Sequence, residues 1–221
     1  MAGSSSHSLL SLEWGTRHSS RIAITSVYLR TIMQPALTLP AWSTRLIAEL
    51  DAADARVRAL FTGISEEQLN WHPQPGAWSV GQCLEHLCIT NELYLSSMSP
   101  SLTGRPPGMV KEIELGWFAR WFITSFVEPS SNTKKARAPK KIVPGSRVEL
   151  SILDRFLRSN ENACEMIRSA SGYDVNRIRF KNPFLPLVRF TVGTGLEAMC
   201  KHERRHLLQA ERVANSPEFP K

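Results

Sequence analysis

The sequence lacks long hydrophobic runs and has few cysteines, none of them in a pair with metal-binding spacing. A membrane-spanning helix needs about 18 consecutive apolar residues, and no segment approaches that length. The absence of any CxxC pair argues against a zinc ribbon and against a disulfide framework. We therefore expect a soluble, cytoplasmic protein with buried free thiols at its four cysteines. These are Cys83, Cys88, Cys164 and Cys200.

Acidic residues are outnumbered by basic ones, which gives a formal net charge of +7. Much of this excess lies in one loop-like segment without interleaved aromatic residues. Its basic residues are Lys134, Lys135, Arg137, Lys140, Lys141 and Arg147. Nucleic-acid surfaces are recognised by how basic residues are distributed rather than by total charge. We expect a solvated basic loop; the alternative is a surface for nucleic acid or an acidic partner.

Residues 1–32 differ in composition from the rest of the chain. They contain eight serines, three arginines and a single acid, Glu13. A transit peptide has such a composition, but an over-extended reading frame that should start at Met33 accounts for it equally. We favour the second interpretation and expect a disordered extension over residues 1–32. Residues 33–221 would then form one domain, a size that supports a substantial core.

Four segments show the three- and four-residue apolar spacing of amphipathic helices. They cover residues 40–62, 79–98, 146–171 and 194–213. The last three begin with the Ser/Thr-x-x-Glu/Gln pattern of a capping box, at Ser79, Ser146 and Thr194. The pattern predicts an all-α protein with a four-helix bundle. The long connector between the second and third main helices predicts a topology other than up-down-up-down.

Weaker signals lie between these helices. The aromatic-rich segment 109–127 is interpreted as a further helix that packs on the bundle as a lid, and Ser65 could cap one short turn. Strand signals are confined to residues 22–29 and 184–192.

Two histidines lie four residues apart in the last predicted helix, at His202 and His206. This spacing stacks their Cβ atoms about 5–6 Å apart on one helix face. Both fall on the buried side, where an unpartnered polar group costs about 1–3 kcal/mol. A metal ion would satisfy both rings if a third ligand arrived, and His86 on the second helix is the candidate. Core packing alone remains the alternative for an isolated HxxxH pattern, and no HExxH protease motif is present.

Two motifs together resemble the DinB/YfiT-like family of metalloenzymes. They are PGAWSVGQCLEHLCITNELYL and VGTGLEAMCKHERRHLLQAERV, and the similar segments span about residues 40–214, including APKKIVPGS. The resemblance implies a DinB-like four-helix bundle with a divalent metal held by His86, His202 and His206. Relatives include thiol-dependent transferases and isomerases that use bacillithiol, mycothiol or related low-molecular-weight thiols. Nickel and zinc both occur in the family, so zinc or nickel is expected here.

Three neutral histidines would leave a coordination position open, as in catalytic zinc sites. We therefore expect a metal-dependent transferase of the thiol S-transferase type or a hydrolase, acting on a small molecule through a metal-bound water or thiolate. Gln82 and Gln209 are candidates for supporting the ligands, although Gln82 is equally explained as the capping partner of Ser79. Cys83 and Cys200 are interpreted as core residues.

The alternative function is a non-catalytic, metal-stabilised helical stress or partner-binding protein. For either function we expect no nucleic-acid partner and no membrane partner. A homodimer is an option that the sequence leaves open.

Overall fold

Four long helices build the part of the chain that the computed structural model describes, which is residues 38–128, 138–185 and 187–221. They are α2 (Ala41–Phe61), α4 (Val80–Leu102), α6 (Ile152–Ala170) and α7 (Val192–Ala214). All belong to one unit, Leu39–Lys221. The all-α prediction is confirmed. The expectations for residues 1–32 and for a strand at 22–29 lie outside the described residues.

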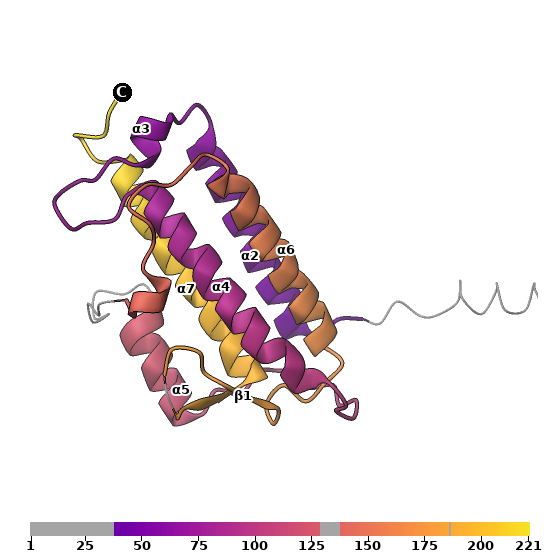
Figure 1. The fold of residues 1–221 in the computed structure, drawn as a ribbon. Coiled ribbons are helices and arrows are strands. Elements are labelled where there is room, and N and C mark those ends of the chain that lie inside the picture. The colour runs from indigo at the N-terminus through magenta and orange to yellow at the C-terminus, as the bar shows by residue number, and fades with distance from the viewer. Residues whose placement is uncertain (1–37, 129–137, 186) are drawn as a thin grey trace, which may run out of the picture. The chain divides into compact units, whose positions relative to one another are not determined.

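The four helices lie side by side, with α4 packed on α6 and α7, and α2 packed on the same two helices (Figure 1). Two contacts give their directions. The start of α4, at Gly81, faces Val148 just before α6, whereas Met98 near its end faces Gly195 at the start of α7. Helices α4 and α6 are therefore parallel and α7 is antiparallel to both. This arrangement needs a long connection back along the bundle, as the sequence predicted.

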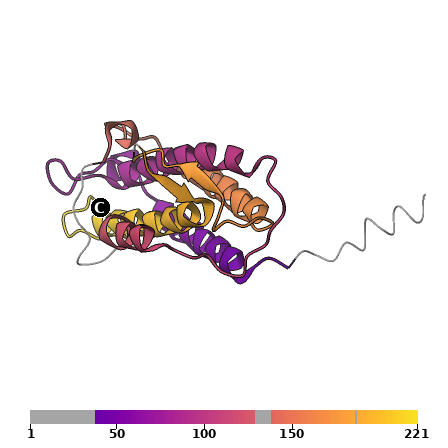
Figure 2. The ribbon, with the colours of Figure 1, turned by 90° about the horizontal axis from the view of Figure 1, so that it is seen from below.

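Short elements occupy the connections. They are α3 (Glu66–Leu69), α5 (Trp117–Phe122), the π-helical turn η1 (Ile123–Val127), the 3₁₀ turn η2 (Lys140–Ile142) and the strands β1 (Arg179–Lys181) and β2 (Arg189–Thr191). The two strands pair antiparallel, with Phe180 opposite Phe190. Figure 2 shows this ribbon lying against the helices, where β1 contacts α4 and β2 contacts α7. Within the described residues, no helix combines the length and the apolar character that a bilayer crossing demands.

The predicted start of α4 is correct, but those of α6 and α7 are wrong. Ser79 and Gln82 form the expected capping box, and α3 has one of its own at Ser65. Helix α6 begins only at Ile152, with no side-chain cap. Helix α7 begins two residues before the predicted cap, because the Thr191 hydroxyl, not that of Thr194, accepts the capping bond.

The predicted helix over 109–127 is half correct. Residues 109–116 are not helical, and only α5 and η1 follow. Part of the aromatic surface packs on the core, as Phe122 does against Phe190 with ring centroids 5.5 Å apart. Trp117 is 82% exposed and Trp121 47% exposed, so the segment covers the bundle only in part.

The core of the bundle is divided into two apolar clusters. One surrounds Trp42, Met98 and Leu196, and the other surrounds Leu84 and Phe156. Buried polar side chains lie at intermediate positions along the helices. They are His86, Thr90, Asn91, Ser159, Asn160, Glu203 and His206. A polar layer inside a helical bundle is the kind of location in which cofactor and metal sites are built.

Candidate metal centre

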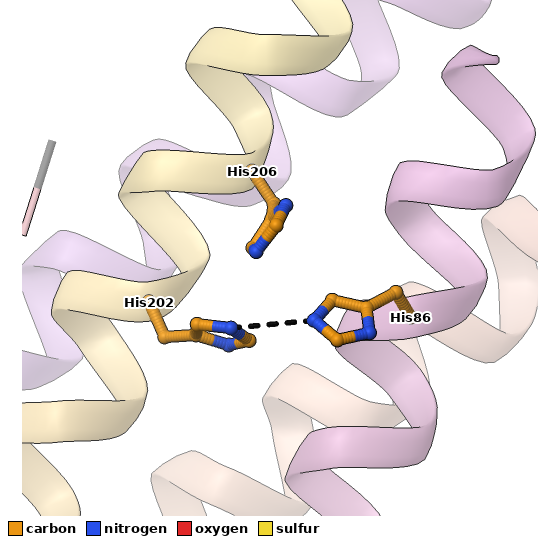
Figure 3. Close-up of side chains that lie close together, drawn as sticks. All are labelled: His86, His202 and His206. Atoms are coloured by element: carbon orange, nitrogen blue, oxygen red, sulfur yellow. Dashed lines mark hydrogen bonds between the residues drawn. The ribbon is translucent and has the colours of Figure 1, made fainter. Parts of the chain in front are cut away.

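The structure brings the three predicted histidines together between α4 and α7 (Figure 3). His202 and His206 project from successive turns of α7, as their spacing predicted, and His86 projects from α4 toward them. The ring centroids are 4.6 to 5.1 Å apart. His86 and His206 are buried, whereas His202 keeps part of its surface exposed. The remaining described histidine, His72, is exposed elsewhere and contacts Ala77.

One ring nitrogen from each histidine points into a common space. The three atoms lie within 4.8 Å of one another, and the group contains no Asp, Glu or Cys. Nε2 of His86 and Nε2 of His202 are 3.3 Å apart. Zinc binds imidazole nitrogen at about 2.0–2.1 Å, so two nitrogens on a tetrahedral ion are about 3.3–3.4 Å apart. This pair therefore already has the separation that a shared ion requires.

Hydrogen bonds fix the tautomers of two rings. Nδ1 of His86 donates to the carbonyl oxygen of Ile142 at 2.7 Å, because a carbonyl can only accept. Nδ1 of His206 lies 3.0 Å from Oε1 of Gln209 and donates to it. Both rings then present an unprotonated Nε2 to the common space. Ligand histidines in metal sites are held in the same way through their other nitrogen.

The two ring nitrogens of His202 also suit a metal ligand. Its Nε2 faces the lone pair of His86, and two facing lone pairs repel unless a proton or a cation lies between them. Nδ1 of His202 is buried and has no hydrogen-bond partner among the described residues. No protein group therefore prevents this ring from carrying its proton on Nδ1 and presenting Nε2 as a ligand. The donor set fits a divalent ion with nitrogen preference.

All three rings favour the neutral form that metal binding needs. Burial lowers the pKa of His86 below its ordinary value of 6.5, and its bond to Ile142 opposes that shift in part. Burial lowers the pKa of His202 and of His206 well below 6.5, and the neighbouring histidines and Arg205 lower both further. Protons therefore compete weakly with a metal at neutral pH.

The two glutamines named from the sequence have different roles. Gln209 contacts the ligand candidate His206. Gln82 completes the capping box with Ser79, and its Nε2 donates to the carbonyl of Gly145 at 2.8 Å. It has no hydrogen bond to any histidine that the structure describes, so it supports the connector rather than a ligand.

Sequence reasoning missed Trp78, which packs against two of the rings. Its ring centroid lies 4.7 Å from that of His86 and 5.6 Å from that of His206. The Trp-Ser pair that precedes α4 was the available signal.

A buried carboxyl group lies in the same layer, where α7 contacts α4 and α6. Glu203 is 1% exposed and accepts hydrogen bonds from Asn160 at 2.9 Å and Asn91 at 3.3 Å. Burial raises its pKa from 4.5 to about 8, and the two amide bonds lower it in part.

The described cysteines are free and buried, as predicted. Burial raises the pKa of Cys83 and of Cys88 to about 12. A thiol that stays protonated is a poor nucleophile, so these side chains belong to the core.

The fold and the site define a class of protein, a helical bundle with three histidines that could hold a divalent metal ion between two antiparallel helices. The chain belongs to the DinB superfamily, whose family model matches residues 49–210. The matched region includes all three histidines. Neither the curated proteins nor the solved structures contain a match to the chain.

Proposed function

We propose that this chain is a metal-dependent enzyme that performs thiol transfer or hydrolysis on a small molecule, with zinc or nickel held by His86, His202 and His206. The observation that carries the proposal is the convergence of three neutral imidazole nitrogens in a group that gains no fourth ligand from the described residues. Three histidines with an open position are typical of catalytic rather than structural zinc sites. Nitrogen ligation also favours zinc or nickel over calcium or magnesium.

When bound, such an ion lowers the pKa of a coordinated thiol or water. The chain's own residues supply orientation and shielding. Ile142 and Gln209 hold two rings by their outer nitrogens, and Trp78 covers two of them. The partly exposed His202 marks the side from which a small molecule would approach. A reducing cytoplasm would keep the buried cysteines as thiols, and we propose that compartment.

The metal content of the purified protein tests the site. The native chain should bind one divalent ion, and His86→Ala and His206→Ala should each lose it. His72→Ala is the matched control, because this histidine is exposed and does not belong to the group. Full metal content in both ligand variants would contradict the proposal.

Activity requires a separate experiment. Thiol-conjugation and hydrolysis substrates should be screened with and without a chelator, and turnover should disappear with the metal. A protein that only loses thermal stability on chelation, with no turnover, would favour the alternative function of a metal-stabilised partner-binding protein. The exposed Trp117 and Trp121 on α5 are the observation that favours this alternative, because large exposed apolar side chains mark docking surfaces.

A further inference from the structure

Arg205 lies on α7 between two of the histidines and is half-buried. Its Nη1 donates to the carbonyl oxygen of Phe126 in η1 at 2.9 Å. Arg205 directly precedes His206 and follows His202 by three residues, so its backbone lies within one helical turn of both rings. Its planar group has five donors, which suits bidentate binding of a carboxylate or phosphate.

No carboxylate pairs with Arg205 within the described residues. Glu128, which follows η1, instead accepts from Lys201 at 3.0 Å and from Arg204 at 3.1 Å. Glu203 faces the opposite side of α7, where Asn160 and Asn91 bind it. A partly desolvated guanidinium without a counter-ion is costly, and an anionic ligand would remove that cost.

The connector beside His86 adds further positive charge. Residues 129–147 contain six basic residues and no acidic one. The turn η2 carries exposed Lys140 and Lys141 directly before Ile142, whose carbonyl binds His86. Of these basic residues, Lys140 and Lys141 therefore lie within two residues of the carbonyl that binds His86. The neutral histidines cannot offset the positive charge of Arg205 and these lysines, and a bound divalent ion would increase the positive charge.

We propose that the metal centre takes an anionic small molecule and that Arg205 binds its carboxylate or phosphate group. The inference rests on the proposed function for the metal and adds the substrate class. The reacting end of the molecule would lie at the histidines and its anionic group at the guanidinium. Attraction by Lys140 and Lys141 would favour its approach.

Two thiols that differ in one group provide the test. Mercaptoacetate carries a carboxylate and 2-mercaptoethanol does not, and inorganic phosphate is a third probe without a thiol. Binding is measured by calorimetry on metal-free and cobalt-loaded protein, with the cobalt absorption spectrum as a second readout. Arg205→Gln keeps a donor for the Phe126 carbonyl but removes the charge, whereas Arg205→Lys keeps the charge. Arg212→Gln is the matched control, since Arg212 is exposed two turns further along α7.

A hydrogen bond to a charged group contributes about 1.5–3 kcal/mol, which corresponds to about 10- to 100-fold in affinity. We expect cobalt-loaded native protein to prefer mercaptoacetate over 2-mercaptoethanol by about that factor. Arg205→Gln should lose the preference, Arg205→Lys should keep part of it, and Arg212→Gln should keep all of it. Tight phosphate binding with weak mercaptoacetate binding would identify phosphate as the anion.

The outcomes separate this inference from the proposed function. An unchanged preference in Arg205→Gln, or no anion binding by any protein, would overturn the inference while leaving the metal site standing. If the protein bound no cobalt, the proposed function would fail. Titrations of the metal-free protein with mercaptoacetate and phosphate would then test anion recognition alone. Anion binding that depends on Arg205 would sustain it, and equal anion affinity in Arg205→Gln and the native protein would overturn it.

Discussion

Replacing Glu203 by glutamine should remove a buried ionisable group while preserving its shape. The carboxyl oxygens of Glu203 accept from the side-chain amides of Asn160 and Asn91. The amide oxygens of both asparagines are buried and have no partner among the described residues. A protonated Glu203 offers the donor that they lack, and a glutamine amide offers one at every pH.

The pH dependence follows from the raised pKa of Glu203. The unfolded chain loses this proton near pH 4.5, whereas the folded protein keeps it until about pH 8. Stability is therefore lost as the pH rises from about 4.5 to about 8, and the loss is constant above that range. One pH unit corresponds to about 1.4 kcal/mol, so the upper limit is about 4.8 kcal/mol. Local rearrangement and water penetration reduce it, and we expect about 2–4 kcal/mol between pH 5 and pH 9.

Urea unfolding at pH 5, 7 and 9 measures this difference, with a chelator present so that no metal charge acts on the carboxyl group. Relative to the native protein, Glu203→Gln should gain about 2–4 kcal/mol of unfolding free energy between pH 5 and pH 9. Glu161→Gln, at an exposed position on α6, is the matched control and should follow the native profile. Parallel profiles for Glu203→Gln and the native protein would refute the reasoning, because Glu203 would then be ionised in the folded state.

Further predictions concern packing and the support of the ligands. Gly195→Ala should destabilise the protein by about 1–3 kcal/mol in urea unfolding, because the new Cβ would lie 2.7 Å from the buried ring of Phe180. This loss should outweigh the helix propensity of alanine, which is better than that of glycine by about 1 kcal/mol. A more stable variant would contradict this packing. Gln209→Ala should weaken metal binding about 10- to 100-fold in a chelator competition, because His206 loses its orienting acceptor. Gln82→Ala should instead lower stability by about 0.5–2 kcal/mol and weaken metal binding less than Gln209→Ala does, and equal metal affinities in the two glutamine variants would contradict the assigned roles.

The helices could be predicted because their apolar spacing is a local property of the sequence, but two of their starts depend on distant residues. The Ser146 pattern does not cap α6, because Asn70 binds the backbone N–H and carbonyl of Val148 and holds this segment outside the helix. At α7 the expected partner of Thr194, Glu197, instead pairs with Arg45 on α2. A capping pattern forms a cap only when no tertiary contact competes for its groups.

The same distinction applies to the site. The four-residue spacing placed His202 and His206 on one face, and His86 on the second predicted helix was the candidate for the third member. The carbonyl of Ile142 could not be predicted, because a backbone group leaves no signature in the sequence. Arg205 was equally hidden, since its significance comes from the absence of a carboxylate beside it in the described structure.

The connector between α4 and α6 is attached to the same face of α4 that carries His86. Gln82 and Glu85 bind the carbonyl and the N–H of Gly145, and His86 binds the carbonyl of Ile142. Metal binding favours the tautomer of His86 that this carbonyl also favours, so the two events are thermodynamically linked. Suppose that a molecule docks on the connector and displaces Ile142. By reciprocity, it must lower the affinity for the metal by the same factor by which the bound metal lowers the affinity for that molecule. The connector is thus a place from which metal occupancy could be controlled without contact with any ligand.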